Sequence, residues 1–231
     1  RSKLEAPETT SEVVARMALE ILTFRSLFRN TKAEIHDGPK ITYESSKWLW
    51  LFALIFHYSF LVVVIRHMRL FLNPVPAVIE WLDWADSMFE IMTPSLYMTT
   101  AGLLAGVVFL FGRRLLNRQV RYISLANDYF PLVLIFAIGV TGLLMRHFLR
   151  GGIDIVAIKQ LAVGLVTFQP VINTDIGSIF YIHLFLVSAL LVYFPFSKLM
   201  HLGGVFMSPT RNMKNNSRAV RHINPWNPDI K

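Results

Sequence analysis

WLWLFALIFHYSFLVVVIRHMRLFL, residues 48–72, is an apolar stretch that carries two histidines, His57 and His67, ten positions apart. A helix needs about 20 apolar residues to cross a lipid bilayer, and this stretch is long enough. Ionisable side chains inside a membrane are costly and mark functional sites. The two histidines of this span therefore each require a partner elsewhere in the chain.

The composition indicates a membrane protein. Hydrophobic residues make up 54% of the chain and charged residues only 16%, whereas a soluble domain carries about 25% charged residues. Three further apolar stretches have spanning length, at about 91–112, about 129–149 and about 178–200. A shorter one within 151–170 carries Asp154 and Lys159 and is expected to form a short interfacial helix.

The expected fold class is an all-α integral membrane helical bundle with four visible transmembrane helices plus interfacial helices. Residues 1–47 form a cytoplasmic lead, in which 13–28 show helical spacing of apolar residues interrupted by three charges and predict an amphipathic interfacial helix rather than a span. Residues 29–47 are expected to be a polar connector with a turn at Gly38 and Pro39. Residues 48–200 form the transmembrane domain, and 201–231 form a basic cytoplasmic tail.

The connectors indicate the orientation. Residues 113–121 contain four arginines and no acid, whereas 73–90 contain four acids and no Lys or Arg. Basic residues also precede the first span and follow the fourth. By the positive-inside rule these three basic regions are cytoplasmic, and four spans alternate with this pattern without conflict. The net charge of +8 therefore reflects membrane topology, and nucleic acid is not expected as a partner.

The chain contains no cysteine, which excludes disulfides, covalent c-type haem and cysteine-ligated metal clusters. Histidines are left as the main candidate ligands. His183 and His201 lie on the fourth span, eighteen residues apart, which is five helical turns. Since the first and fourth spans run in opposite directions, adjacent packing would pair His57 with His201 near the inner face and His67 with His183 near the outer face.

Two imidazoles that face each other across a bundle are suited to be the axial ligands of a haem iron. Two such pairs predict two b-type haems stacked across the bilayer, which suits transmembrane electron transfer. The alternatives are hydrogen-bonded packing histidines, or a haem-free membrane anchor or transporter with a histidine proton relay. Zinc or copper is disfavoured because no thiolate or carboxylate accompanies the pairs.

The spacing of the histidines resembles that of the nitrate reductase gamma-type cytochrome b family. FPFSKLMHLGG at 194–204 and SPTRNMKNNSRAVRHINPWNP at 208–228 resemble, more specifically, the DsrM-type dihaem cytochromes of the DsrMKJOP complex of sulfur metabolism. The resemblance covers most of 45–228. A gamma subunit of nitrate reductase and a membrane subunit of heterodisulfide reductase remain the alternatives within this class. The family has a span before the first one seen here, so an upstream fifth span is expected to be missing.

The resemblance implies a prokaryotic inner-membrane, quinol-reactive cytochrome b subunit of a multi-subunit oxidoreductase. It implies electron exchange with a quinone at the outer haem, and we expect this quinone to be menaquinone. At the inner haem it implies exchange with a cytoplasmic iron–sulfur subunit of the DsrK type, with further membrane and periplasmic subunits as partners. The ligand set it implies is His67 with His183 and His57 with His201. No lysine stands at the start of the second span, where the nitrate reductase members use one to bind quinone.

Other residues are candidates for supporting roles. Arg66 lies beside His67 and is expected either to bind a haem propionate or to extend to the lipid headgroups. Arg146 and His147, at the outer end of the third span, are expected either to contact quinone, with His147 as a proton acceptor, or to extend to the lipid headgroups. Asp154 and Lys159 are further quinone candidates, and a solvated helix face is the alternative for both.

Overall fold

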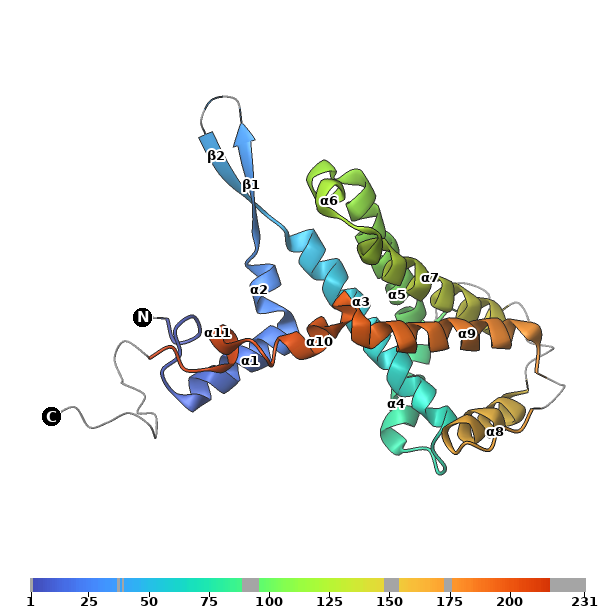
Figure 1. The fold of residues 1–231 in the computed structure, drawn as a ribbon. Helices are drawn as coiled ribbons and strands as arrows, with labels where there is room; N and C mark the ends of the chain where they lie inside the picture. The colour runs from blue at the N-terminus through green and yellow to red at the C-terminus, as the bar shows by residue number, and fades with distance from the viewer. Residues whose placement is uncertain are drawn as a thin grey trace. The chain divides into compact units, whose positions relative to one another are not determined.

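The computed structural model describes residues 2–36, 38, 40–88, 96–147, 154–172 and 176–216. These residues are mostly helical, with one β-hairpin (Figure 1). The chain forms two compact units. We call Arg1–Trp50 together with Leu199–Lys231 the terminal unit, and Leu51–Lys198 the bundle unit.

Four helices in the described residues are long and apolar enough to cross a membrane, so the predicted helical membrane bundle is confirmed. The spans include α3 (Lys47–His67), α5 (Met98–Leu116), α7 (Ala126–His147) and α9 (Ser178–Tyr193). Two spans are extended by 3-10 turns, η1 (Met68–Leu70) after α3 and η3 (Phe194–Phe196) after α9. Helix α9 is mostly apolar and has no fully buried residue, and its main polar exception is His183.

Two span boundaries differ from the predicted ones. Helix α5 begins at Met98, after Tyr97 in an extended conformation, and it continues to Leu116 rather than ending near 112. Residues 91–95, where we expected the span to begin, lie outside the described residues. The fourth span ends at Phe196 rather than at 200 because Pro195 lacks an amide hydrogen and Ser197 is extended. His201 therefore lies beyond the span, at the start of α10 (His201–Gly204).

Glycines let α3 approach α5 closely within the bundle unit. A Cβ atom on Gly106 would lie 2.8 Å from the Cβ of Phe56, and one on Gly102 would lie 2.5 Å from the Oγ of Ser59. This GxxxG spacing is the small-residue packing expected for the second span. Phe52 and Phe109 stack at 4.0 Å on the same pair of helices.

Other helices of the bundle unit pack onto this pair directly or through one another. Helix α7 lies beside both α5 and α9 (Figure 1). The buried side chains of Phe56, Leu103, Val107 and Ile135 form a core between α3, α5 and α7. Helix α4 (Ala77–Ser87) occupies the predicted acidic connector, and α6 (Arg118–Ile123) the predicted basic one.

A short helix lies between the third and fourth spans, as predicted. Helix α8 (Ile155–Val166) has 12 residues, which corresponds to about 18 Å and is too short to cross a bilayer. Its buried residues Ala157, Ile158 and Leu161 form a second core with Ile176, against which Leu70 and Phe180 pack.

The terminal unit contains a hairpin that we did not expect. Strands β1 (Thr31–His36) and β2 (Lys40–Ser45) pair antiparallel, where the sequence predicts only a polar connector. The expected turn is present at Gly38, whose φ of 90° is in the left-handed region that favours glycine. Pro39 lies outside the described residues.

The helix predicted at 13–28 is two helices, α1 (Thr10–Thr23) and α2 (Arg25–Phe28), separated by Phe24 in the left-handed conformation. Helix α1 begins earlier than predicted because Thr9 and Glu12 form a capping box. Helix α11 (Pro209–Asn212) packs against α1. Residues 217–231, with His222 and the NPWNP motif, lie outside the described residues, so the basic tail stays a prediction there.

Candidate functional site

His67 on α3 and His183 on α9 face each other within the bundle unit. Their ring centres are 6.4 Å apart, and the ring planes differ by only 18°. A metal ion lies about 2 Å from an imidazole nitrogen, so two imidazoles on opposite sides of one metal have ring centres about 6 Å apart. The spacing of this pair fits two histidines that would hold one haem iron between them.

Hydrogen bonds define which nitrogen of each ring is available. The Nδ1 atom of His67 lies 2.7 Å from the carbonyl oxygen of Val63. A carbonyl oxygen only accepts, so Nδ1 carries the proton and donates it. The Nε2 atom then keeps its lone pair, which is the state that a metal-binding imidazole requires.

His183 reaches the same state through a hydroxyl group. Its Nδ1 atom lies 2.9 Å from the Oγ1 of Thr141 on α7. The only proton of that hydroxyl is donated to backbone carbonyls of α7, at 2.8 Å from Ala137 and 3.0 Å from Ile138. Thr141 therefore accepts from His183, and the Nε2 atom of His183 is left with its lone pair.

Gly142 gives the His183 ring its space. A Cβ atom at this position would lie 3.5 Å from the Cε1 atom of His183, which is ordinary contact, so a longer side chain would press on the imidazole. Helix α7 thus supplies both the hydrogen-bond acceptor and the clearance for a ligand carried by α9.

His57 has the same local geometry as His67. Its Nδ1 atom donates to the carbonyl oxygen of Ala53 at 2.7 Å, one turn earlier on α3. Its predicted partner His201 belongs to the terminal unit, so this pair stays a prediction from the sequence. In the described part of the chain no group of three or more His, Cys, Asp or Glu is arranged to hold a metal ion.

Arg66, next to His67, is engaged by carboxylates of α4. Its guanidinium donates to Asp83, with Nε at 2.9 Å from Oδ1, and forms an ion pair with Asp86. The side chain of Asp86 is 3% exposed and also accepts from the backbone amide of Thr99 at 2.9 Å. Asp83 further pairs with Arg69 at 3.1 Å. The propionate role of Arg66 stays a prediction.

Tyr97 lies between two arginines. The guanidinium carbon of Arg66 is 3.9 Å from the ring centre of Tyr97, and that of Arg146 is 3.4 Å from it. Both distances are within the range of cation–π attraction. Helices α3, α5 and α7 and the acidic helix α4 therefore meet in one charged cluster beside His67. The quinone contacts expected of Arg146 and its neighbour His147 stay predictions.

The candidates on α8 have structural contacts. Asp154 caps the helix, since its Oδ1 accepts from the amide of Val156 at 2.8 Å. The ammonium group of Lys159 donates to the carbonyl oxygen of Leu72 at 2.9 Å, which joins α8 to the chain after η1. Neither contact tests their predicted role with quinone.

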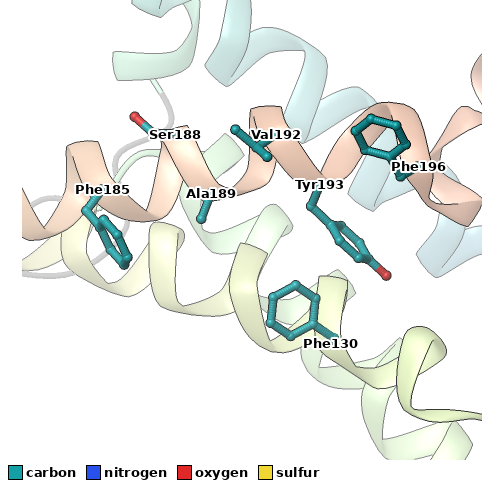
Figure 2. Close-up of a pocket in the computed structure, with 7 residues that line it drawn as sticks. All are labelled: Phe130, Phe185, Ser188, Ala189, Val192, Tyr193 and Phe196. Atoms are coloured by element: carbon teal, nitrogen blue, oxygen red, sulfur yellow. The ribbon is translucent and has the colours of Figure 1, made fainter.

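An apolar groove of about 530 Å³ lies between α7 and α9. In Figure 2 the ring of Phe130 on α7 lies against that of Tyr193 on α9, and the ring centres are 4.9 Å apart. The remaining lining is apolar apart from Ser188. The groove offers no charged group, so the histidine pair rather than this groove is the candidate site.

Sequence reasoning missed three groups of this site. Thr141 belongs to no recognisable motif. A hydroxyl residue in an apolar span could still have been considered as a hydrogen-bond partner for a histidine on a neighbouring span. The acids Asp83 and Asp86 were assigned only to orientation. Tyr97 lies just before a helix that we expected to begin earlier.

The chain resembles known proteins over nearly its whole length. Residues 18–222 match the family model described as nitrate reductase gamma subunit. A protein of Archaeoglobus fulgidus named Hdr-like menaquinol oxidoreductase cytochrome b-like subunit is 45% identical over 231 residues, covering 98% of this chain and 68% of the relative. A protein of the same name from Archaeoglobus profundus is 41% identical, with the same coverage.

Proposed function

The chain belongs to the nitrate reductase gamma subunit family, and from this premise we propose that it is a cytochrome b subunit that carries electrons between membrane quinol and a partner subunit. This family is the nitrate reductase gamma type that the histidine spacing resembles. The names of the two relatives support a quinol-reactive subunit of a larger complex. The finer assignment to the DsrM type, and to sulfur metabolism, is part of this proposal and rests on the sequence motifs alone.

One observation carries the proposal, the 6.4 Å spacing of the His67 and His183 rings with both Nδ1 atoms engaged as donors. These residues would hold a b-type haem by their Nε2 atoms. When bound, a haem supplies a one-electron carrier whose potential depends on its axial ligands and on the hydrogen bonds behind them. Val63 and Thr141 provide those hydrogen bonds and hold the rings in one tautomer.

A second haem held by His57 and His201 extends the proposal. The hydrogen bond from His57 to Ala53 supports it, because it prepares the ring in the same way as that of His67. Two haems would link the two membrane faces, with the His67 pair on the outer side and the His57 pair on the cytoplasmic side. The basic connectors support this orientation.

Quinol, in our proposal menaquinol, reacts near the outer pair. Arg146, His147, Asp154 and Lys159 remain the candidate contacts from the sequence. On the cytoplasmic side the partner is an iron–sulfur subunit of the DsrK or heterodisulfide reductase type. Further membrane and periplasmic subunits complete the complex.

A reduced-minus-oxidised spectrum of the purified protein tests the function. We expect a b-type α band, and we expect His67→Ala and His183→Ala each to remove one haem while the other is retained. His36→Ala, outside both pairs, is the control and should keep the full content. A protein without the α band would instead be a haem-free anchor or transporter. Loss of the same haem in His57→Ala and His67→Ala would contradict the pairing.

A further inference from the structure

Helix α1 of the terminal unit exposes an apolar face. Between residues 14 and 22 every exposed residue of the helix is apolar. Val14 is 61% exposed and Ile21 is 38% exposed, although both are large aliphatic side chains. Val14, Ala18 and Ile21 follow one another at spacings of four and three, so they form one continuous helix face.

Two charged residues of the same helix, Arg16 and Glu20, are covered by the C-terminal part of the chain. Arg16 is buried and donates to the carbonyl oxygens of Arg211 and, at 3.0 Å, Met213. Glu20 forms an ion pair with Arg211 at 2.5 Å. Burial and the nearby charge of Arg211 lower the pKa of Arg16. Since a buried guanidinium needs these acceptors, the helix cannot rotate its apolar face inward without a large cost.

The end of α1 is attached to the beginning of a membrane span. The indole Nε1 of Trp50, in the first turn of α3, donates to the carbonyl oxygen of Thr23 at 2.7 Å. The ring of Phe28 packs edge-on against Trp50 with centres 4.9 Å apart. Tryptophans at the ends of spans lie at the level of the lipid headgroups. The C-terminal end of α1 is therefore held at that level.

We propose that the apolar face of α1 lies in the bilayer, at the boundary between headgroups and acyl chains of the leaflet where α3 begins. Lipid is the occupant because the tie to Trp50 brings the helix to the membrane surface. An interfacial helix buries its apolar face about 5–10 Å into this boundary. The C-terminal segment covers the charged face of α1, which is the face that would otherwise be exposed to water. This inference is independent of haem and quinol.

Single cysteines test the orientation because residues 1–231 contain no other cysteine. Val14→Cys, Ala18→Cys and Ile21→Cys are labelled with a nitroxide, and the protein is placed in nanodiscs of phosphatidylethanolamine and phosphatidylglycerol. Glu44→Cys, at an exposed charged position on β2, is the matched control. We expect the three face probes to collide more with oxygen than with a water-soluble nickel chelate, and the control to show the reverse.

Two outcomes would overturn the inference. The face probes would report water to the same degree as the probe at Glu44, or they would become shielded only after the other subunits of the complex are added. The second result would assign the face to a protein partner. Equal thermal unfolding of all four labelled variants would show that the fold of the terminal unit is preserved.

Discussion

At the scale of single residues, three imidazoles of the bundle unit have one hydrogen-bonding state. His57 and His67 donate from Nδ1 to carbonyl oxygens one turn earlier, and His183 donates to a hydroxyl group on a neighbouring helix. The first two bonds belong to the helix backbone and no side-chain substitution removes them. The bond of His183 involves the side chain of Thr141, so it can be tested by substitution.

Replacing Thr141→Val removes the acceptor of the His183 Nδ1 proton while keeping the side-chain volume. Loss of such an outer hydrogen bond lowers metal affinity about 10–100-fold. We therefore expect the dissociation constant for haem to rise by a similar factor, so that the variant loses haem at protein concentrations at which the natural protein retains it. Haem retention measured by the α band, together with the midpoint potential, checks this. Ser188→Ala on α9 is the control, because that hydroxyl donates to the carbonyl oxygen of Leu184 on its own helix. If Thr141→Val retained haem as well as the natural protein and had the same midpoint potential, Thr141 would have no role in holding the ligand.

Arg66 and Arg69 offer a matched pair of charges beside His67. The Arg66 side chain is 11% exposed and bridges two acids, whereas Arg69 is 50% exposed and pairs with Asp83. Removing one member of a buried ion pair leaves an uncompensated charge, which costs about 3–5 kcal/mol. An exposed pair contributes about 0–1 kcal/mol.

We therefore expect Arg66→Ala to lower the free energy of unfolding in detergent by about 3 kcal/mol, because Asp86 stays buried. Arg69→Ala should change it by less than about 1 kcal/mol. Thermal unfolding followed by circular dichroism compares the two variants. Equal effects would mean that the burial of the Arg66 pair does not determine its contribution.

At the scale of elements, the contact of α3 with α5 depends on glycine. A methyl group on Gly106 would meet the backbone of Phe56 at 3.1 Å, so the helices would have to separate. Gly106→Ala is expected to destabilise the protein by about 2 kcal/mol, as over-packing does. Gly112 lies on the same helix, where an added methyl group would have open space within 4 Å, and Gly112→Ala should be neutral or stabilising. Thermal unfolding of both variants checks this, and equal losses would contradict the packing argument.

The membrane spans were predictable because a continuous run of about twenty apolar residues is typical of a transmembrane helix and rare in other structures. Their number and approximate places agree with the structure, and so does the short helix α8. The depth argument pairs His67 with His183, and their rings lie close together. Their role as haem ligands stays a prediction.

Other elements were not predictable from composition alone. The end of α9 depends on the missing amide hydrogen of Pro195 and on the extended Ser197, which hydropathy does not record. The hairpin at 31–45 is polar, and its pairing depends on contacts between its own strands. The carboxylate partners of Arg66 come from α4, a helix that we treated as a connector. Long-range contacts of this kind carry no local signal.

At the scale of the whole molecule, both ends of the chain build one unit. The amide of Asn215 donates to the carbonyl oxygen of Pro7 at 2.6 Å, and Arg16 binds two carbonyls near α11. Residues 51–198 form the other unit. It contains all four spans except the first turn of α3, which belongs to the terminal unit. Because the two terminal segments contact each other, they lie on the same side of the membrane. The number of spans between them must therefore be even. Four spans satisfy this requirement.

The side on which the connectors lie is testable with the same cysteine-free chain. Val78 on α4 and Gln119 on α6 are exposed, and they belong to the acidic and the basic connector. The positive-inside rule predicts that the arginine-rich connector lies in the cytoplasm. We expect Val78→Cys to react with a membrane-impermeant maleimide in intact spheroplasts, and Gln119→Cys to react only after permeabilisation. The reversed pattern would invert the bundle, and the His67 pair, with the proposed quinol reaction, would then lie on the cytoplasmic side.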